Sequence, residues 1–364
     1  MKKSTKYKLL LFLLIPLVTL LTYWYAAMPN AWEEIYSMGI NKFIIQGFSL
    51  IFGIFPFSVF EFFIYTAILL VIIYPIYLIV KIVKNYKVGW RIFFNGLLNV
   101  GVVITIFFSA FILMWGLNYK RPQFGISEKI VAGEYTTEQL GELYDYLLNQ
   151  AAQIRTQLPE DENGAMQALG DYKDIFKRAQ LGYDVAGENF IELTGDYGMA
   201  KPILASKWLN YTGITGIYSP FTGEPNVNIA ILDLNLPVTT CHEMAHQRGY
   251  GFEDQCNFIA YLTCIMHPDL DFQYSGYILA ISYISNALAS SNYPLLLELN
   301  NNMSDEVRFD LNYHNDYWTQ FDGDVQEMSN NINSSYLQAN GVQSGTNSYG
   351  KVVDLLLAYY DKFY

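Results

Sequence analysis

The sequence predicts a membrane-anchored α+β protein, in which three N-terminal transmembrane helices precede a mostly helical domain with a small sheet. Hydrophobic residues make up 52% of the 364 residues and charged residues only 15%, well below the usual quarter of a soluble protein. The charge is also divided unevenly. Residues 1–117 hold 9 Lys/Arg and 3 Asp/Glu, net +6, whereas residues 118–364 hold 13 and 31, net −18. We therefore expect a membrane anchor over 1–117 and an acidic domain over 118–364.

Three apolar runs in the first third of the chain are long enough to cross a bilayer, which takes about 20 residues. They cover approximately residues 9–27, 57–80 and 93–115. The lysines before the first run would also suit a secretory signal peptide. That run is long for a signal peptide and no A-x-A cleavage site follows it, so an uncleaved anchor is the favoured interpretation.

Residues 43–57 form a shorter apolar stretch that contains Gly and Pro, and it fits an interfacial or re-entrant segment better than a span. The basic residues decide the topology. They gather at the N-terminus and between the second and third runs, as Lys81, Lys84, Lys87 and Arg91. Three crossings put both clusters in the cytoplasm, as the positive-inside rule requires. The domain over 118–364 is then extracytoplasmic.

Composition also limits the partners. A sequence pI near 4.8 argues against a nucleic-acid-binding protein, so we expect the lipid bilayer and no nucleic acid. Spans with so few polar residues offer little support for a transporter. Glu61, near the start of the second run, is expected to reach the membrane interface.

The domain over residues 118–364 is called the outer domain below. Its helices and strands are predicted from the spacing of apolar residues and from the Gly, Pro and Asn residues that interrupt them. A helix should start after Thr136, with Gln139 as the reciprocal capping residue, and end near Thr156. Residues 182–225 are expected to form loops with short strands, and Glu224 is expected to be a turn residue, with a place in the lining of the cleft as the alternative. We expect one strand over 226–232 and further helices over 165–181, 238–249, 253–266, 271–290, 293–301, 304–333 and 349–363.

Residues 242–246 read His-Glu-Met-Ala-His within a strongly helical stretch. His242 and His246 are four residues apart, so they share one helix face and can bind one Zn²⁺. Glu243 can reach a metal-bound water as the general base. With only 4 histidines in the chain, this pairing predicts a zinc site.

A third ligand should come from the next helix, which Glu253 opens after the turn at Gly249 and Gly251. A metzincin pattern would place its ligand at 252, but that residue is Phe252. Glu253 is therefore the favoured ligand, with Asp254 or a distant Glu as alternatives. Asn257 lies one turn later and can hydrogen-bond a ligating His. The arrangement looks like that of zincins whose third ligand is a glutamate, the gluzincins.

Two other groups of residues are weaker candidates. Zinc-dependent peptide hydrolysis needs a donor for the oxyanion, for which Arg308, His314 and Tyr349 are suitable by chemistry alone. Small buried thiols are the favoured interpretation of the three cysteines, with Cys256 as a minor alternative metal ligand. Cys256 and Cys264 lie too far apart on one helix for a disulfide, while a bond from Cys241 to either stays open.

Several segments resemble an uncharacterised bacterial family, a domain of unknown function whose members combine N-terminal spans with a zincin-like HExxH domain. The resemblance covers nearly the whole chain. Its segments are Trp115–Pro122, Gly213–Glu224, His242–Gly249, Glu253–Tyr261, Tyr336–Asn340 and Ser348–Tyr349. Gln255-Cys256 stands where an acid and a small residue are expected. The resemblance implies a multi-pass protein of the bacterial cytoplasmic membrane with a metallopeptidase domain, and it supplies no substrate.

Two hypotheses follow. The first is a zinc metallopeptidase that hydrolyses peptide bonds outside the membrane, with zinc on His242, His246 and Glu253 and with Glu243 as the base. The second is a non-catalytic membrane sensor or scaffold with a zinc-binding domain. Neither the substrate nor the oligomeric state follows from the sequence.

Overall fold

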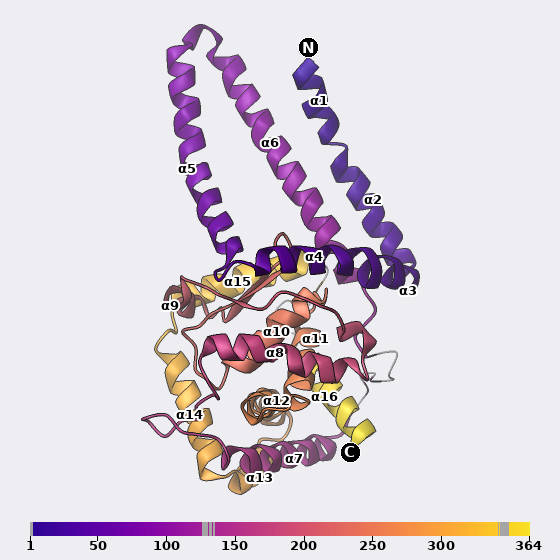
Figure 1. Ribbon diagram of the computed structural model, residues 1–364, viewed down its shortest axis with the longest axis vertical. Helices are drawn as coiled ribbons and strands as arrows, with labels where there is room; N and C mark the ends of the chain where they lie inside the picture. Colours follow the sequence, from indigo (N-terminus) through magenta and orange to yellow (C-terminus); the bar gives the residue numbers. More distant parts are fainter. Residues whose placement is uncertain (1–2, 126–129, 131–132, 134, 341, 343–348) are drawn as a thin grey trace.

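The computed structural model describes residues 3–125, 130, 133, 135–340, 342 and 349–364. The molecule has two parts along its longest axis (Figure 1). Three long helical rods form one end and a mostly helical domain with a small sheet forms the other. The predicted combination of N-terminal apolar helices with a mostly helical α+β domain is confirmed.

The rods are formed by the three long apolar runs. The first is α1 (Lys3–Leu11) with α2 (Leu14–Ala27), the second is α5 (Val59–Lys84), and the third is α6 (Gly89–Met114), reached through the short 3₁₀ helix η2 (Tyr86–Val88). Both α2 and α5 pack on α6. The side chains on the outside of these rods are apolar and exposed, as expected of surfaces that face lipid.

The segment between α2 and α5 has a different course. It contains α3 (Pro29–Trp32), the π-helix η1 (Glu33–Asn41) and α4 (Lys42–Gly53), and Figure 1 shows α4 running across the end of the rods rather than alongside them. By length and composition four segments could cross a membrane: Thr5–Ala27, Pro29–Gly53, Val59–Lys84 and Tyr86–Met114. Ile45 and Ser49 on α4 are buried, while Phe43, Ile51 and Ile54 are exposed.

The outer domain is built from helices around a three-stranded sheet. The sheet has the order β1-β3-β2, with β1 (Lys201–Pro202) parallel and β2 (Gly216–Ser219) antiparallel to β3 (Glu224–Val227). The larger helices are α7 (Thr137–Arg155), α8 (Tyr172–Gly187), α10 (Leu236–Gln247), α11 (Glu253–Ile265), α12 (Leu270–Ser291), α14 (Asp305–Thr319), α15 (Asp324–Ala339) and α16 (Tyr349–Phe363). The short ones are η3 (Gly116–Lys120), η4 (Ile191–Leu193), α9 (Ser206–Leu209), η5 (Asn210–Thr212), α13 (Tyr293–Leu299) and η6 (Asn300–Asn302).

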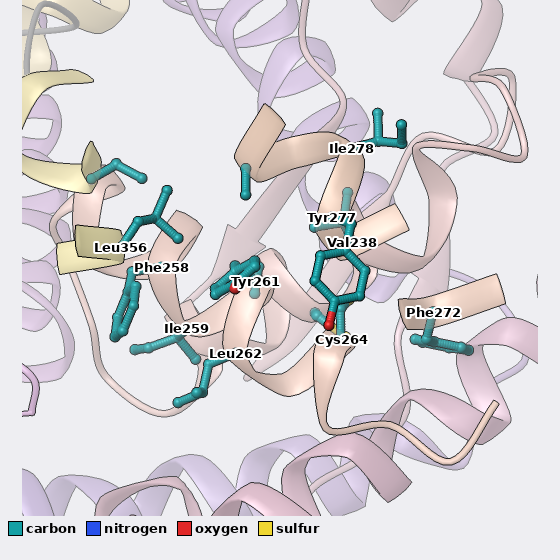
Figure 2. Close-up of a cluster of buried hydrophobic side chains, with 14 of the residues drawn as sticks. Val238, Phe258, Ile259, Tyr261, Leu262, Cys264, Phe272, Tyr277, Ile278 and Leu356 are labelled. Carbon is teal, nitrogen blue, oxygen red and sulfur yellow. The ribbon is translucent and has the colours of Figure 1, made fainter. Parts of the chain in front are cut away.

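The main core surrounds α11, which packs against α8, α10, α12 and α16. Phe258, Ile259 and Leu262 on α11 are fully buried. Figure 2 shows them among Val238 of α10, Phe272 of α12 and Leu356 of α16. Close packing on every side fixes the position of α11, and this helix carries Glu253 at its first position.

Most predicted helices are confirmed, and the capping box of Thr136 and Gln139 opens α7 as expected. Two helices and one strand were predicted in the wrong position. The helix expected over 165–181 is α8, which begins later because the Asp171 carboxylate caps the N–H groups of Lys173 and Asp174. The helix expected over 304–333 is divided into α14 and α15 at Gly323, a residue of low helix propensity.

The strand expected over 226–232 is β3, which ends at Val227. Asn228 turns the chain away, because its side-chain oxygen accepts from the N–H of Ala230 at 2.9 Å, as in an Asx turn. Its amide also donates to the Asn210 side chain and to the Ile214 carbonyl.

Two carboxylates join the rods to the outer domain, and the sequence had predicted a different role for each. Glu61 in the first turn of α5 is buried, and its carboxylate accepts from the N–H groups of Leu204 and Ala205 at 2.8 and 2.9 Å. Glu224 begins β3 instead of a turn, and it accepts from the N–H groups of Val59 and Phe60 at the start of α5. Each part thus satisfies backbone donors of the other, including unpaired donors of a helix N-terminus.

Candidate metal centre

The candidate metal centre lies where α10 meets α11. Helix α10 ends at Gln247, and Gly249 follows in a left-handed conformation with a φ of 85°. Glycine adopts this conformation without the strain that a side chain would add. The turn is short enough to bring Glu253, the first residue of α11, opposite the histidine face of α10.

Three ligand atoms converge at this point. The Nε2 atom of His242 lies 3.2 Å from one carboxylate oxygen of Glu253, and the Nε2 atom of His246 lies 3.8 Å from the other. All three ligand atoms fall within 4.8 Å of one another. Two imidazole nitrogens and one carboxylate oxygen form the ligand set of many catalytic zinc sites, which leave a fourth position for water or substrate.

The two imidazole rings are oriented by other groups. His242 Nδ1 lies 2.9 Å from the side-chain oxygen of Asn257, one turn along α11 from Glu253. His246 Nδ1 lies 2.7 Å from the backbone carbonyl of Tyr250. In each pair the oxygen can only accept, so Nδ1 carries a proton, and Nε2 on the other side of the ring faces Glu253 and is the atom that can bind a metal once it is unprotonated.

Glu243 is buried beside the ligands and lies against the sheet. A Cβ on Gly216 of β2 would come within 2.4 Å of Glu243 Oε1, so the Glu243 carboxylate occupies the space that a side chain at 216 would take. Its Oε2 atom is buried with no hydrogen-bond partner among the described residues. Burial raises the pKa of Glu243 to about 8, the range that suits a general acid or base near neutral pH.

The pKa values of His242 and His246 are shifted in opposite directions. Burial alone would lower the pKa of His242, but its hydrogen bond to Glu253 and the charges of Glu253 and Glu243 raise it to about 9. Burial dominates at His246 and lowers its pKa to about 4. Although burial disfavours the charged form of Glu253, the two histidines lower the pKa of Glu253 to about 2.

An aromatic wall lies beside His246 and reaches to the end of α6. The ring centroid of Trp115 lies 5.7 Å from that of His246, and Tyr218 of β2 stacks on His246 at 6.3 Å. Trp115 Nε1 donates to the hydroxyl of Tyr336 on α15 at 3.0 Å, and the Tyr119 hydroxyl donates to the same oxygen at 3.2 Å. Burial and the nearby charge of Glu253 raise the pKa of Tyr336, although both bonds oppose them. Its own proton remains available to a third group.

The weaker sequence candidates lie apart from the metal centre or outside the described part. Arg308 donates to the backbone carbonyls of Asn300 and Met303. His314 contacts Asn315 and Trp318 on its own helix. Tyr349 begins α16, and its side chain lies outside the described residues.

The alternatives around Glu253 also have defined positions. Asp254 is buried, but it is not part of the group formed by His242, His246 and Glu253. Cys241, Cys256 and Cys264 are free and buried. The thiol of Cys256 lies 3.3 Å from both His246 Nδ1 and the Tyr250 carbonyl, on the Nδ1 side of the ring and not the Nε2 side that faces Glu253.

Reasoning from sequence missed Gly216, Trp115, Tyr218 and Tyr336 as neighbours of the centre. Three segments that carry the family resemblance include them, but no spacing rule relates residues 115, 216 and 336 to a helix at 242. Only the tertiary structure brings them together: β2 packs on α10, Trp115 after α6 lies against His246 of α10, and Tyr336 of α15 is hydrogen-bonded to Trp115.

Comparison with known proteins identifies one family. A family model described as "Protein of unknown function (DUF3810)" matches residues 36–357, which include the whole metal centre and most of the apolar helices. No curated protein and no solved structure matches the chain.

Proposed function

The chain belongs to the DUF3810 family, whose description carries no activity, and from the residues of its own site we propose that it is a membrane-anchored zinc peptidase. The observation that carries this proposal is the convergence of His242, His246 and Glu253 beside a buried Glu243 carboxylate with an unpaired oxygen.

The ligand set fits zinc better than a hard cation such as Mg²⁺, because two of its three donors are imidazole nitrogens. Zinc bound there would bring its water toward neutral pKa and would polarise a carbonyl group. Asn257 and the Tyr250 carbonyl hold both rings in the tautomer that binding requires. Glu253 remains partly exposed, which leaves one side of the centre open to solvent and substrate.

Glu243 is the proposed proton carrier. Its unpaired Oε2 accepts a proton from the attacking water, and the carboxylic acid then gives that proton to the leaving nitrogen of the peptide. The Tyr336 hydroxyl, which accepts from Trp115 and Tyr119 and keeps its own proton, is the proposed donor to the carbonyl oxygen as charge develops there.

The sheet supports a peptide substrate. β2 lies at one edge of the order β1-β3-β2, and Gly216 of β2 lies against Glu243. An extended peptide could pair with that edge by main-chain hydrogen bonds, which would lay its backbone beside the carboxylate.

The anchor is proposed to cross the cytoplasmic membrane three times. The rods of α1–α2, α5 and α6 run side by side while α4 lies across their end (Figure 1), so α4 suits an in-plane position. The N-terminus and the turn between α5 and α6 lie at the far end from the acidic domain. Because these two places carry eight of the nine basic residues of 1–117, all except Lys42 on α4, the positive-inside rule places them in the cytoplasm and the outer domain outside.

Metal analysis and hydrolysis with matched variants test the proposal. We expect one zinc per purified full-length chain, loss of zinc in His246→Ala, and retained zinc in Glu243→Gln. Cleavage of a peptide mixture should fall at least about 100-fold in Glu243→Gln. Absence of zinc from the wild type, or undiminished cleavage by Glu243→Gln, would reject the peptidase. Zinc binding with an unchanged cellular phenotype in Glu243→Gln would favour the sensor or scaffold.

A further inference from the structure

A set of exposed apolar side chains lies on two parts of the outer domain that pack against each other, the α9–η5 segment and α15. It comprises Leu204 just before α9, Trp208 of α9, Tyr211 of η5, and Val325, Met328 and Ile332 of α15. We call these six residues the α9–α15 patch. Trp208 is 77% exposed and Ile332 is 62% exposed. Large exposed side chains of this kind, gathered on one surface, mark an interaction site.

Helix α15 is amphipathic along its exposed side. Val325, Met328 and Ile332 follow one another at intervals of three and four residues, so they share one face of the helix. Glu327 and Asn330 are exposed on other faces. Tyr336 continues the apolar face by one more turn and reaches the aromatic wall of the metal centre through Trp115.

Both halves of the patch contact the ends of α5 and α6 that lie next to the outer domain. The N–H groups of Leu204 and Ala205, just before α9, bind Glu61 in the first turn of α5. At the other half, Tyr336 of α15 contacts Phe111 near the end of α6 and accepts from Trp115 directly after it. Figure 1 shows α15 lying crosswise, at the level of α4 and close to the ends of the rods.

From this continuity we propose that the α9–α15 patch rests on the outer leaflet of the same membrane, with α15 as an in-plane amphipathic helix. The inference rests on the proposed anchoring by α5 and α6. An in-plane helix buries its apolar face at the boundary of headgroups and acyl chains, and Trp and Tyr are enriched at that depth. The outer domain has a net charge of −18, so apolar insertion rather than attraction to anionic lipids holds the patch there.

This placement has a consequence for access to the metal centre. Trp115 bridges the end of α6 and the ring of His246 at 5.7 Å, and Tyr336 belongs both to α15 and to the aromatic wall. The centre therefore lies next to the bilayer surface, and polypeptide segments close to a lipid anchor or a membrane span are the ones that reach it.

Spin labelling in nanodiscs of phosphatidylcholine tests the contact without requiring any activity or zinc. The full-length chain would carry one introduced cysteine at a time, Ile332→Cys or Trp208→Cys in the patch and Asn330→Cys on another face of α15. The native cysteines are buried, so the introduced thiol is the one labelled. Collision rates with oxygen, which partitions into lipid, and with a water-soluble nickel chelate are then compared.

We expect labels at 332 and 208 to collide more with oxygen than with the nickel chelate, and the label at 330 to show the reverse. The order should persist when anionic lipid is added. Equal exposure of all three labels to the nickel chelate would overturn the proposal, because the patch would then lie in water. Shielding of 332 and 208 from both reagents would also overturn it, since a protein surface, such as a second copy of this chain, would then cover the patch.

Discussion

Two buried clusters of charged side chains in the outer domain differ in how completely they are paired. In one, Asp310 of α14 accepts from Arg155 Nε and the Tyr274 hydroxyl at 2.6 Å and from the Met166 N–H at 2.9 Å. In the metal centre, the two histidines and Glu253 face one another, and one oxygen of Glu243 has no partner among the described residues.

The difference separates a structural role from a chemical one. The oxygens of Asp310 bind donors from three segments and hold α7 and α12 against α14, so nothing further needs to bind there. The candidate metal centre leaves Glu243 Oε2 buried without a partner among the described residues, which costs free energy unless a ligand or a reaction uses that atom. Pairing therefore indicates a structural role for Asp310 and leaves Glu243 as the candidate for a chemical one.

Breaking the paired cluster should cause the largest loss of stability. Asp310→Ala leaves the buried guanidinium of Arg155 without its main partner, so the free energy of unfolding should fall by about 3–5 kcal/mol. Thermal unfolding followed by circular dichroism measures it. Asp316→Ala, an exposed acid on the same helix, should change stability by less than about 0.5 kcal/mol. Equal effects of the two variants would contradict the structural role.

A methyl group next to Glu243 should affect hydrolysis rather than metal binding. Gly216→Ala would place its Cβ 2.4 Å from Glu243 Oε1, which forces the carboxylate to move. Displacement of a catalytic group by about 1 Å can lower the rate roughly 100-fold. Zinc content should stay at the wild-type level. In Gly47→Ala the new methyl meets no atom within 4 Å, and this control should keep wild-type turnover.

The orientation of His242 should affect zinc affinity. Asn257→Ala removes the acceptor at 2.9 Å from His242 Nδ1, and loss of such a contact typically weakens metal binding about 10–100-fold. Asn257→Asp keeps an acceptor and should bind zinc at least as tightly as the wild type. Competition with a chromogenic chelator measures both. An unchanged affinity in Asn257→Ala would show that the Asn257 contact does not hold the ring.

Acidification should weaken zinc binding gradually. In the metal-free protein the pKa of His242 is about 9 and that of His246 about 4, so between these values one proton must leave His242 before its Nε2 atom can bind. The affinity should then fall by about tenfold for each pH unit lowered between pH 8 and 5. Measuring Glu243→Gln alongside removes any contribution from the Glu243 proton. An affinity independent of pH would contradict this assignment.

The sequence by itself determined the local features. Apolar runs of sufficient length placed the three rods, the capping box placed the start of α7, and the spacing of His242 and His246 put both on one face of α10. Each of these depends on residues within a few turns of one another, where helix geometry and capping chemistry act. The same reasoning placed Glu253 and Asn257 one turn apart on α11.

Predictions that depended on distant partners were wrong or incomplete. The sequence predicted Glu61 to be an interfacial residue, because it does not show that the backbone of 204–205 lies beside it. It predicted Glu224 to be a turn residue, because it does not show that α5 lies next to β3. No local pattern could place Gly216 against Glu243 or Trp115 against His246.

Only the tertiary structure decided which polar groups are paired and what surrounds the metal centre. Hydrogen-bond pairing and burial are set by segments that are 100 or more residues apart, such as Trp115 and Tyr336, and the sequence carries no spacing rule at that range. Helix periodicity and metal-ligand spacing act within a few turns, so the sequence alone could predict the three candidate ligand residues, but not the aromatic wall or its contact with the end of α6.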